Sequence, residues 1–190
     1  MSNTIDEVLE RLHDGNARFV ADKLEHKLQD RPRRAALKKD GQQPPTIVLS
    51  CADSRVVPEL AFDMGLGELF VIRVAGNVAT TGAIASIEYA VAHLGSCVIV
   101  VLGHESCGAV TAAIAGGDNG HHLNTLLSQI EPAKALNPDG DVTTTVKSNA
   151  QCTATALVER SKVIAAAVEN KTLRVVPAYY ALESGEVSFL

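Results

Sequence analysis

The sequence predicts an α/β fold in which a central, mostly parallel β-sheet is flanked by helices. Three short apolar runs are rich in β-branched residues and show no polar alternation, which is typical of parallel strands covered on both faces. A helix-like segment separates the second run from the third, and this order indicates a right-handed crossover. We expect a single domain over residues 1–190, with a helical arm at 1–40 and an α/β core at 46–190.

The arm begins with an amphipathic helix. Apolar residues recur at roughly helical spacing from Thr4 to about Ala21. The charged stretch Lys23–Lys39 follows, and it is interpreted as a solvated face or as an arm that packs against another subunit. Pro44 and Pro45 stop any helix before the core, because proline lacks the amide hydrogen that a helix needs.

The core contains the three predicted strands Thr46–Ser50, Leu69–Val74 and Cys97–Leu102, with a helix predicted over Thr81–Leu94. Toward the carboxyl end, Gly116–Gly120 and Asn137–Asp141 are predicted loops. The segment Thr143–Asn170 has no Gly or Pro and is predicted to form one long helix. A last strand is expected within Leu173–Leu182, followed by a turn at Ser184–Gly185.

Composition excludes several classes of protein. The chain has 17 basic and 22 acidic side chains, a net charge of −5 with His neutral, and no Trp. Such a chain lacks the basic surface that neutralises phosphates, so neither nucleic acid nor a membrane is an expected partner.

The first six residues have no cationic start or apolar signal core, and the longest apolar run is too short to span a bilayer. A cytoplasmic protein is therefore expected.

Four cysteines, Cys51, Cys97, Cys107 and Cys152, need an explanation. In a reducing cytoplasm, cysteines more often bind metal or react than form disulfides. Cys97 begins a predicted strand and Cys152 lies in the predicted long helix, so both are interpreted as packing residues.

The other two cysteines lie in polar clusters at strand ends. Cys51-Ala52-Asp53-Ser54-Arg55 follows the first strand, and Gly103–Gly108, which contains His104 and Cys107, follows the third. Ligands of parallel sheets bind beyond the carboxyl ends of the strands, so the two clusters can meet. Two Cys and one His suit Zn²⁺, and three protein ligands leave one position open, as in catalytic sites.

Asp53 and Arg55 leave two arrangements open. Asp53 can occupy the fourth position on the metal, or Arg55 can hold its carboxylate in a bidentate pair. Cys107 begins a predicted helix whose amino end favours a thiolate. Each residue alone also has an ordinary structural explanation, and only the two clusters together indicate a metal site. His121-His122 lies in the Gly-rich loop and is expected to be exposed rather than a ligand pair.

Several segments together match one known family. They are Gly15–Phe19, Ser50–Val56, Gly67–Val71, Arg73–Asn77 and Leu102–Gly108. In their order and spacing the sequence resembles the β-class carbonic anhydrases over nearly the whole chain. The resemblance implies one zinc ion per chain on Cys51, His104 and Cys107. It also implies that Asp53 pairs with Arg55 in the active state or binds zinc in a closed, inactive state.

The resemblance implies a substrate pocket and an oligomer as well. Gln42 matches a residue that hydrogen-bonds substrate near the subunit boundary, Phe70 and Tyr89 match apolar lining positions, and Gly108 offers a backbone N–H. A homodimer or a tetramer built from two dimers is expected. Some members hold a second bicarbonate beside a Trp at the position of Val48, and a regulatory site of that kind is not expected here.

The implied reaction is the reversible hydration of carbon dioxide to bicarbonate and a proton by zinc-bound hydroxide. Two thiolates cancel the charge of zinc, so the bound water should be less acidic than the value of about 7 found with three His ligands. Activity is therefore expected to rise on the alkaline side. Arg55 holding Asp53 off the metal leaves Asp53 able to accept a hydrogen bond from the hydroxide.

Three alternatives compete with this interpretation. A zinc hydrolase of carbon disulfide or carbonyl sulfide uses the same scaffold and ligands. A non-catalytic zinc-binding module has no use for Asp53 and Arg55 together. A nucleotide-binding protein is disfavoured because Gly65-x-Gly67 lacks the third glycine and precedes a strand.

Overall fold

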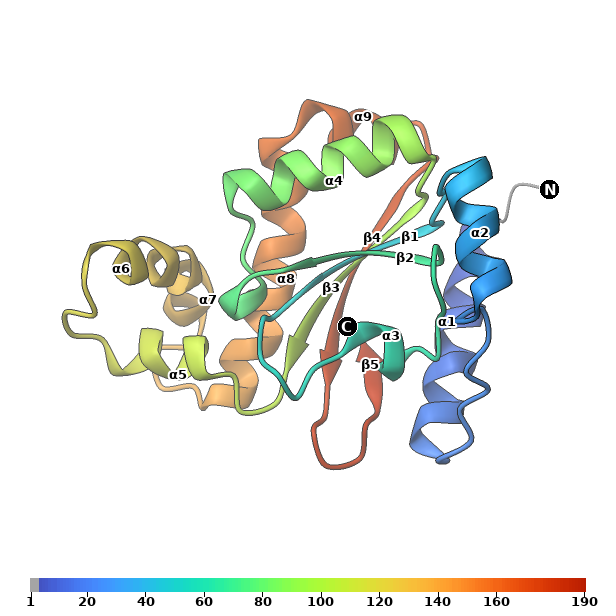
Figure 1. The fold of residues 1–190 in the computed structure, drawn as a ribbon. Helices are drawn as coiled ribbons and strands as arrows, with labels where there is room; N and C mark the ends of the chain where they lie inside the picture. Colours follow the sequence, from blue (N-terminus) through green and yellow to red (C-terminus); the bar gives the residue numbers. More distant parts are fainter. Residues whose placement is uncertain (1–3) are drawn as a thin grey trace.

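A five-stranded β-sheet forms the centre of the molecule (Figure 1). The structure is a computed structural model that describes residues 4–190, so residues 1–3 of the predicted arm lie outside the described residues. The strands are β1 (Thr46–Ser50), β2 (Leu69–Arg73), β3 (Val98–His104), β4 (Arg174–Tyr180) and β5 (Val187–Phe189). Their order is β2-β1-β3-β4-β5, with β1 to β4 parallel and β5 antiparallel to β4. The predicted mostly parallel sheet is confirmed.

Helices cover both faces of this sheet. They are α1 (Ile5–Val20), α2 (Arg31–Asp40), α3 (Pro58–Ala61), α4 (Thr81–Leu94), α5 (Gly108–Ala115), α6 (His121–Leu127), α7 (Glu131–Leu136), α8 (Val142–Arg160) and α9 (Lys162–Glu169), with short 3₁₀ turns η1 (Ala75–Asn77) and η2 (Ser128–Ile130). Helices α4, α8 and α9 pack on one face, whereas α1 and α3 cover the other (Figure 1). None of the helices within residues 4–190 is long and apolar enough to cross a membrane.

The alternation of side chains along β1 divides the core into two layers. Ile47 and Leu49 are fully buried against α4, α8 and α9, and Val48 is fully buried on the opposite face with Leu12 of α1. Since a shift of one residue would exchange the two faces, burial on both sides fixes the register of the strand. This register sets where the polar residues after β1 emerge.

Helix α1 confirms the predicted amino-terminal helix and is held at both ends. A capping box at its start joins Thr4 and Glu7, each side chain accepting from the other's backbone amide. Near its end, the buried Asn16 donates to the carbonyls of Ala61 and Gly185 and accepts from the amide of Val187. These contacts fasten α1 to α3 and to the β4–β5 hairpin of its own chain.

The structure corrects the prediction of one long helix over Thr143–Asn170. Helix α8 ends at Arg160, and Ser161 is extended with φ −124° and ψ 114°. The Ser161 hydroxyl accepts from the amide of Ile164, which caps α9, and donates to Glu88 of α4 at 2.6 Å. A side-chain cap and a tertiary hydrogen bond therefore break a segment that lacks Gly and Pro.

Other boundaries differ because short elements carry weak periodic signals. Strand β3 extends through His104, so this residue ends the strand rather than following it. His121 and His122 begin α6 instead of lying in a loop, although both are exposed as expected. Helices α3 and α7 and strand β5 were not predicted.

Asp63 holds the segment that follows α1. Its side chain is 3% exposed and accepts hydrogen bonds from Arg18 Nε at 2.6 Å and from the amides of Glu25 and His26. Burial raises the pKa of this carboxyl, but these hydrogen bonds outweigh burial, so the pKa lies below its usual range. The stabilisation is thus present above the unfolded pKa of about 3.9 and is lost as pH falls through the lower folded pKa.

Substituting Asp63→Asn should lower the free energy of unfolding at about pH 7 by about 1.5–3 kcal/mol, the usual range for hydrogen bonds to a charged group. Urea titrations should show the difference from wild type shrinking as pH falls from the unfolded pKa of about 3.9 through the lower folded pKa. Asp22→Asn is the matched control, because Asp22 is exposed and has a similar left-handed φ of 54° against 48°. An equal loss at both positions, or a loss independent of pH, would contradict this account.

Candidate metal centre

Three side chains with metal-binding atoms converge where β1 and β3 end. Cys51 follows β1, His104 ends β3, and Cys107 precedes α5 as its N-cap. Their two sulfur atoms and the nearest ring nitrogen all lie within 4.8 Å of one another. Strands β1 and β3 are parallel neighbours, with Ser50 paired to Leu102, so these ends must meet at one edge of the sheet. The predicted convergence of the two clusters is confirmed.

The three side chains lie in a dry environment. Cys51 is 4% exposed, and His104 and Cys107 are fully buried. Both cysteines belong to an apolar cluster built mainly from α5, α6, η2 and α8, which includes Ile130 and Val146, together with Val78 after η1. Exclusion of water strengthens electrostatic interactions and makes an unpaired polar atom costly.

The hydrogen bonds of His104 leave one nitrogen free for a metal. Nδ1 lies 2.8 Å from the carbonyl oxygen of Glu105, which can only accept, so Nδ1 carries the proton. Nε2 is buried and has no hydrogen-bond partner. A lone pair on a buried, unpartnered nitrogen beside two sulfurs fits a borderline-soft divalent metal. Within residues 4–190, no second group of three such donors occurs.

The pKa values of the two cysteine thiols are shifted in opposite directions. A hydrogen bond from the Cys107 thiol and one from the Gly76 N–H outweigh burial and lower the pKa of Cys51. The neighbouring Cys51 thiolate and burial raise the pKa of Cys107. One thiolate is therefore already favoured in this pocket, and a bound cation would favour the second.

Asp53 is held at the rim of the site by Arg55. Two parallel hydrogen bonds of 2.9 and 2.8 Å join Arg55 Nε and Nη2 to the two carboxylate oxygens. This pairing keeps the pKa of Asp53 well below its usual range. Arg55 also donates to the carbonyl of Ser106, between His104 and Cys107 in the chain. Of the two arrangements that the sequence left open, this structure has the bidentate pair, with Asp53 Oδ2 3.9 Å from His104 Nε2.

Sequence reasoning missed two residues that shape the loop after β1. Arg73, at the end of β2, donates from Nε to the carbonyl of Cys51 at 3.0 Å and from Nη2 to that of Asp53 at 2.6 Å. The N–H of Gly76 donates to Cys51 Sγ at 3.4 Å. Both belong to the segment Arg73–Asn77, which resembled the family but received no role. Only the parallel pairing of β2 with β1 places them beside the loop.

The remaining predicted site residues lie in different places. Gly108 directly follows Cys107 as the first residue of α5. Gln42 lies four positions before β1, at the opposite end of the strand from Cys51. Phe70 and Tyr89 contact each other, with ring centroids 6.4 Å apart, and Tyr89 is 50% exposed. The structure brings the predicted ligands, Asp53 and Arg55 together, but it does not bring Gln42 to them within one chain.

Cys97 and Cys152 are free, half-buried and outside the metal-binding group, as their interpretation as packing residues requires. Burial raises the pKa of both thiols.

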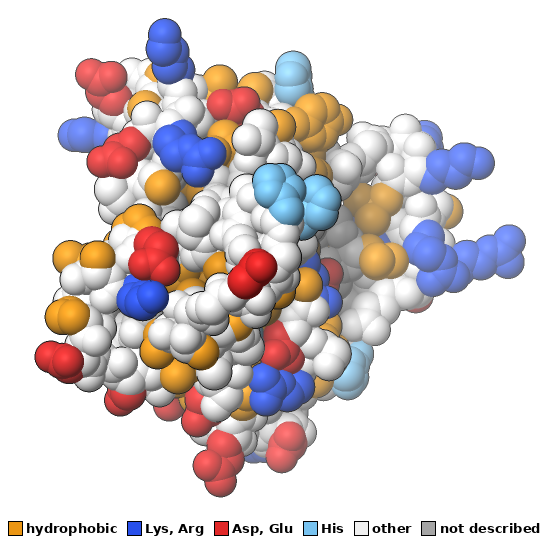
Figure 2. All heavy atoms as spheres, turned by 90° about the vertical axis from the view of Figure 1, so that its left-hand side faces the viewer, with side chains coloured by type: hydrophobic (Ala, Val, Ile, Leu, Met, Phe, Trp, Pro, Cys, Tyr) orange, Lys and Arg blue, Asp and Glu red, His pale blue; other side chains and the backbone are white. Residues whose placement is uncertain are grey.

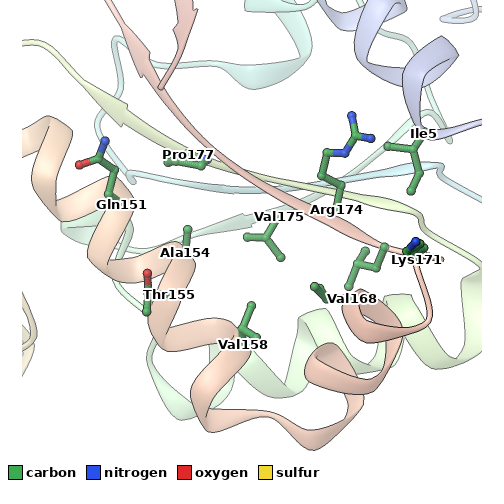
Figure 3. A pocket seen from close by; sticks show the side chains of 11 residues that line it. Ile5, Gln151, Ala154, Thr155, Val158, Val168, Lys171, Arg174, Val175 and Pro177 are labelled. Atoms are coloured by element: carbon green, nitrogen blue, oxygen red, sulfur yellow. The ribbon is translucent and has the colours of Figure 1, made fainter.

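The surface carries mixed charge on one face and a groove that lies apart from the predicted site residues. Figure 2 shows acidic and basic side chains interspersed over one face, with basic side chains gathered at its right-hand edge. A groove of about 640 Å³ lies between α8, α9 and β4, where Val158, Val168 and Val175 point toward one another (Figure 3). None of the predicted site residues lines it. The buried donor set therefore defines the candidate site.

Comparison with known proteins gives the family. The model of the carbonic anhydrase family matches residues 46–187. One solved structure, from work on two tetrameric β-carbonic anhydrases of Sordaria macrospora, matches with a TM-score of 0.77 at 24% identity, covering 93% of each chain. The chain belongs to the β-carbonic anhydrase family. Carbonic anhydrase 2 of Mycobacterium tuberculosis is 39% identical over 181 residues, which cover 92% of this chain and 87% of that protein. The carbonic anhydrase of Mycolicibacterium smegmatis is 39% identical over 183 residues, covering 93% and 88%.

Substituting Cys107→Ser should remove a bound divalent metal, because a serine hydroxyl stays protonated and is a poor ligand for soft metals. The loss of affinity should exceed the roughly 10–100-fold that a residue hydrogen-bonded to a ligand costs. Elemental analysis of purified protein gives the metal-to-chain ratio, expected to be about one in wild type. Cys152→Ser, the same sulfur-to-oxygen change on α8, should keep the metal, and retention in Cys107→Ser would refute the ligand assignment.

Proposed function

We propose that this β-carbonic anhydrase family member is a zinc enzyme that interconverts carbon dioxide and bicarbonate. The observation that carries the proposal is the buried Cys51–His104–Cys107 group, with its unpartnered His104 Nε2, beside the Asp53–Arg55 pair. A purely structural zinc site uses four protein ligands, whereas this group supplies three. The open fourth position and the ion pair beside it suit catalysis.

The donor chemistry favours zinc. Two thiolates and one neutral imidazole form a ligand set that zinc takes in catalytic sites, at tetrahedral geometry. Zinc held there would supply a Lewis acid that makes water acidic enough to yield hydroxide at moderately alkaline pH. The hydrogen bond from Nδ1 to the Glu105 carbonyl fixes the His104 tautomer and aims Nε2 at the metal position.

Asp53 would orient the attacking oxygen. Arg55 keeps its carboxylate ionised and occupied by a bidentate pair, so that Asp53 is held back from direct ligation. From its place 3.9 Å from His104 Nε2, the carboxylate can accept a hydrogen bond from water at the open position. Binding of Asp53 to the metal in a closed state would require both hydrogen bonds to Arg55 to break.

The substrate pocket requires a second copy of the chain in this proposal. Gly108 offers its backbone N–H from the same chain, beside Cys107. Gln42 lies beyond the far end of β1, so a partner subunit must bring this residue to the site. Phe70 and Tyr89 are proposed as apolar lining of the pocket. A homodimer is the smallest complete unit, and a tetramer of two dimers is the larger form; the β-carbonic anhydrases of Sordaria macrospora are tetrameric. A cytoplasmic location is part of the proposal, because the four free cysteines suit a reducing compartment.

Stopped-flow hydration of carbon dioxide tests this function. Zinc-loaded wild type should be active, with a rate that rises on the alkaline side, because two thiolates make water at the zinc less acidic than the value of about 7 seen with three His ligands. Asp53→Asn should keep zinc and lower the rate about 10–100-fold. The control Asp22→Asn changes an exposed carboxylate and should keep the wild-type rate.

Protein with one zinc per chain and no hydration at alkaline pH would overturn the proposal. Sulfide release from carbon disulfide or carbonyl sulfide by such a protein would favour the alternative hydrolase. A rate that stays flat over about pH 6 to 9 would contradict the charge argument. Equal zinc loss in Asp53→Asn and Cys107→Ser would contradict the separate roles of these residues.

A further inference from the structure

A buried asparagine on α8 touches the turn that holds the Cys51 sulfur. Asn149 is 1% exposed, and its Nδ2 donates to the carbonyl oxygen of Gly76 at 2.8 Å. Gly76 in turn donates its own N–H to Cys51 Sγ at 3.4 Å. One side chain from α8 is therefore linked to a predicted metal ligand through a single backbone residue.

Gly76 sits in a backbone position that no other residue fits well. Its φ of +70° lies in the left-handed region, and an added Cβ would be 3.0 Å from Ile130 Cδ1 and 3.2 Å from Ala109 Cβ. The turn η1 is thus pressed against η2 and α5. Gly76 is buried, so its carbonyl oxygen needs a hydrogen-bond donor, and Asn149 of α8 provides it.

Helix α8 provides a rigid platform for that donor. One turn before Asn149, Val146 packs in the same cluster as Cys51 and Cys107. Val146 Cγ1 lies only 2.9 Å from where a Cβ on Gly103 would be, so α8 lies close to the strand that carries His104. Ala150 packs into the core against the sheet. Asn149 is therefore fixed relative to both cysteines and His104.

The surroundings of Asn149 are not those of a residue that serves packing alone. Its Oδ1 is buried and has no hydrogen-bond partner, and the same holds for Nδ2 of the neighbouring Asn77. A buried polar atom without a partner costs free energy. The side-chain oxygen of Asn149 thus has no hydrogen-bond partner, while its amide nitrogen donates one hydrogen bond, to the Gly76 carbonyl.

We propose that Asn149 is a positioning residue of the metal site: it fixes Gly76 so that the Gly76 N–H remains on the sulfur of Cys51. The inference rests on the zinc site of the proposed function. An N–H donor directed at a thiolate withdraws charge from the sulfur and fixes its orientation, and such outer contacts tune metal affinity. Asn149 itself does not touch the metal or the substrate.

The test measures metal binding rather than turnover. Asn149→Ala should weaken zinc binding about 10–100-fold in competition with a chromophoric chelator. In the cobalt-substituted protein, the thiolate-to-cobalt charge-transfer band should shift, because the Cys51 sulfur has lost a directed donor. Asn149→Leu keeps the branched shape of the side chain without the donor, and it should reproduce both changes without opening a cavity.

The matched control is Asn16→Ala. Asn16 is also a buried asparagine, 6% exposed, and its three hydrogen bonds go to the backbone of Ala61, Gly185 and Val187 rather than to the metal-site residues. Its substitution should lower the thermal midpoint while leaving zinc affinity and the cobalt band unchanged. A double-mutant cycle with Gly76→Ala adds a further check. Because both substitutions act on the same contact, the double variant should lose less zinc affinity than the sum of the two single losses.

The outcomes separate the two proposals. Wild-type zinc affinity and an unshifted cobalt band in both Asn149 variants would overturn the positioning role and leave the zinc site intact. Equal loss of affinity in Asn16→Ala would also overturn it, because the effect would then follow general stability. A wild-type chain that binds no zinc would overturn the proposed function and this inference with it.

Discussion

The parallel pairing of β1 with β3 is the constraint on which the candidate metal centre depends. Cys51 and His104 are 53 positions apart in the chain, and no local element can bring them together. Because Ser50 pairs with Leu102, both strands deliver their next residues to one edge of the sheet. Burial of both faces of β1 holds this register, since a slip of one residue would turn its apolar side chains to the wrong layers.

Two arginine side chains hold the loop after β1 in place through hydrogen bonds to its backbone and side chains. Arg73 from β2 fixes the carbonyls of Cys51 and Asp53, and Arg55 joins Asp53 to the carbonyl of Ser106. Most of these hydrogen bonds involve a charged group, so each is stronger than a neutral one. These contacts fix the loop that carries Cys51 and Asp53 beside the buried His104 and Cys107.

The sequence was informative wherever the signal was local or repeated. Apolar runs located β1 and β2 closely, and the two polar clusters identified Cys51, His104 and Cys107 because parallel sheets place strand ends together. The break at Ser161 was missed because it depends on a hydrogen bond to Glu88, 73 positions away. Likewise, the contact of Asn149 with Gly76 joins residues 73 positions apart, and no spacing rule predicts it. The roles of Gln42, Phe70 and Tyr89 stay predictions, because Gln42 lies at the far end of β1 and Phe70 and Tyr89 contact each other rather than the metal-binding group.

The central claim is that two sulfurs and one imidazole nitrogen hold the catalytic zinc. X-ray absorption at the zinc edge of active protein measures this ligand set directly. The account predicts two zinc–sulfur distances of about 2.3 Å and one zinc–nitrogen distance of about 2.0–2.1 Å, with one lighter ligand besides. A zinc shell without sulfur, or one built from four sulfurs, would contradict it.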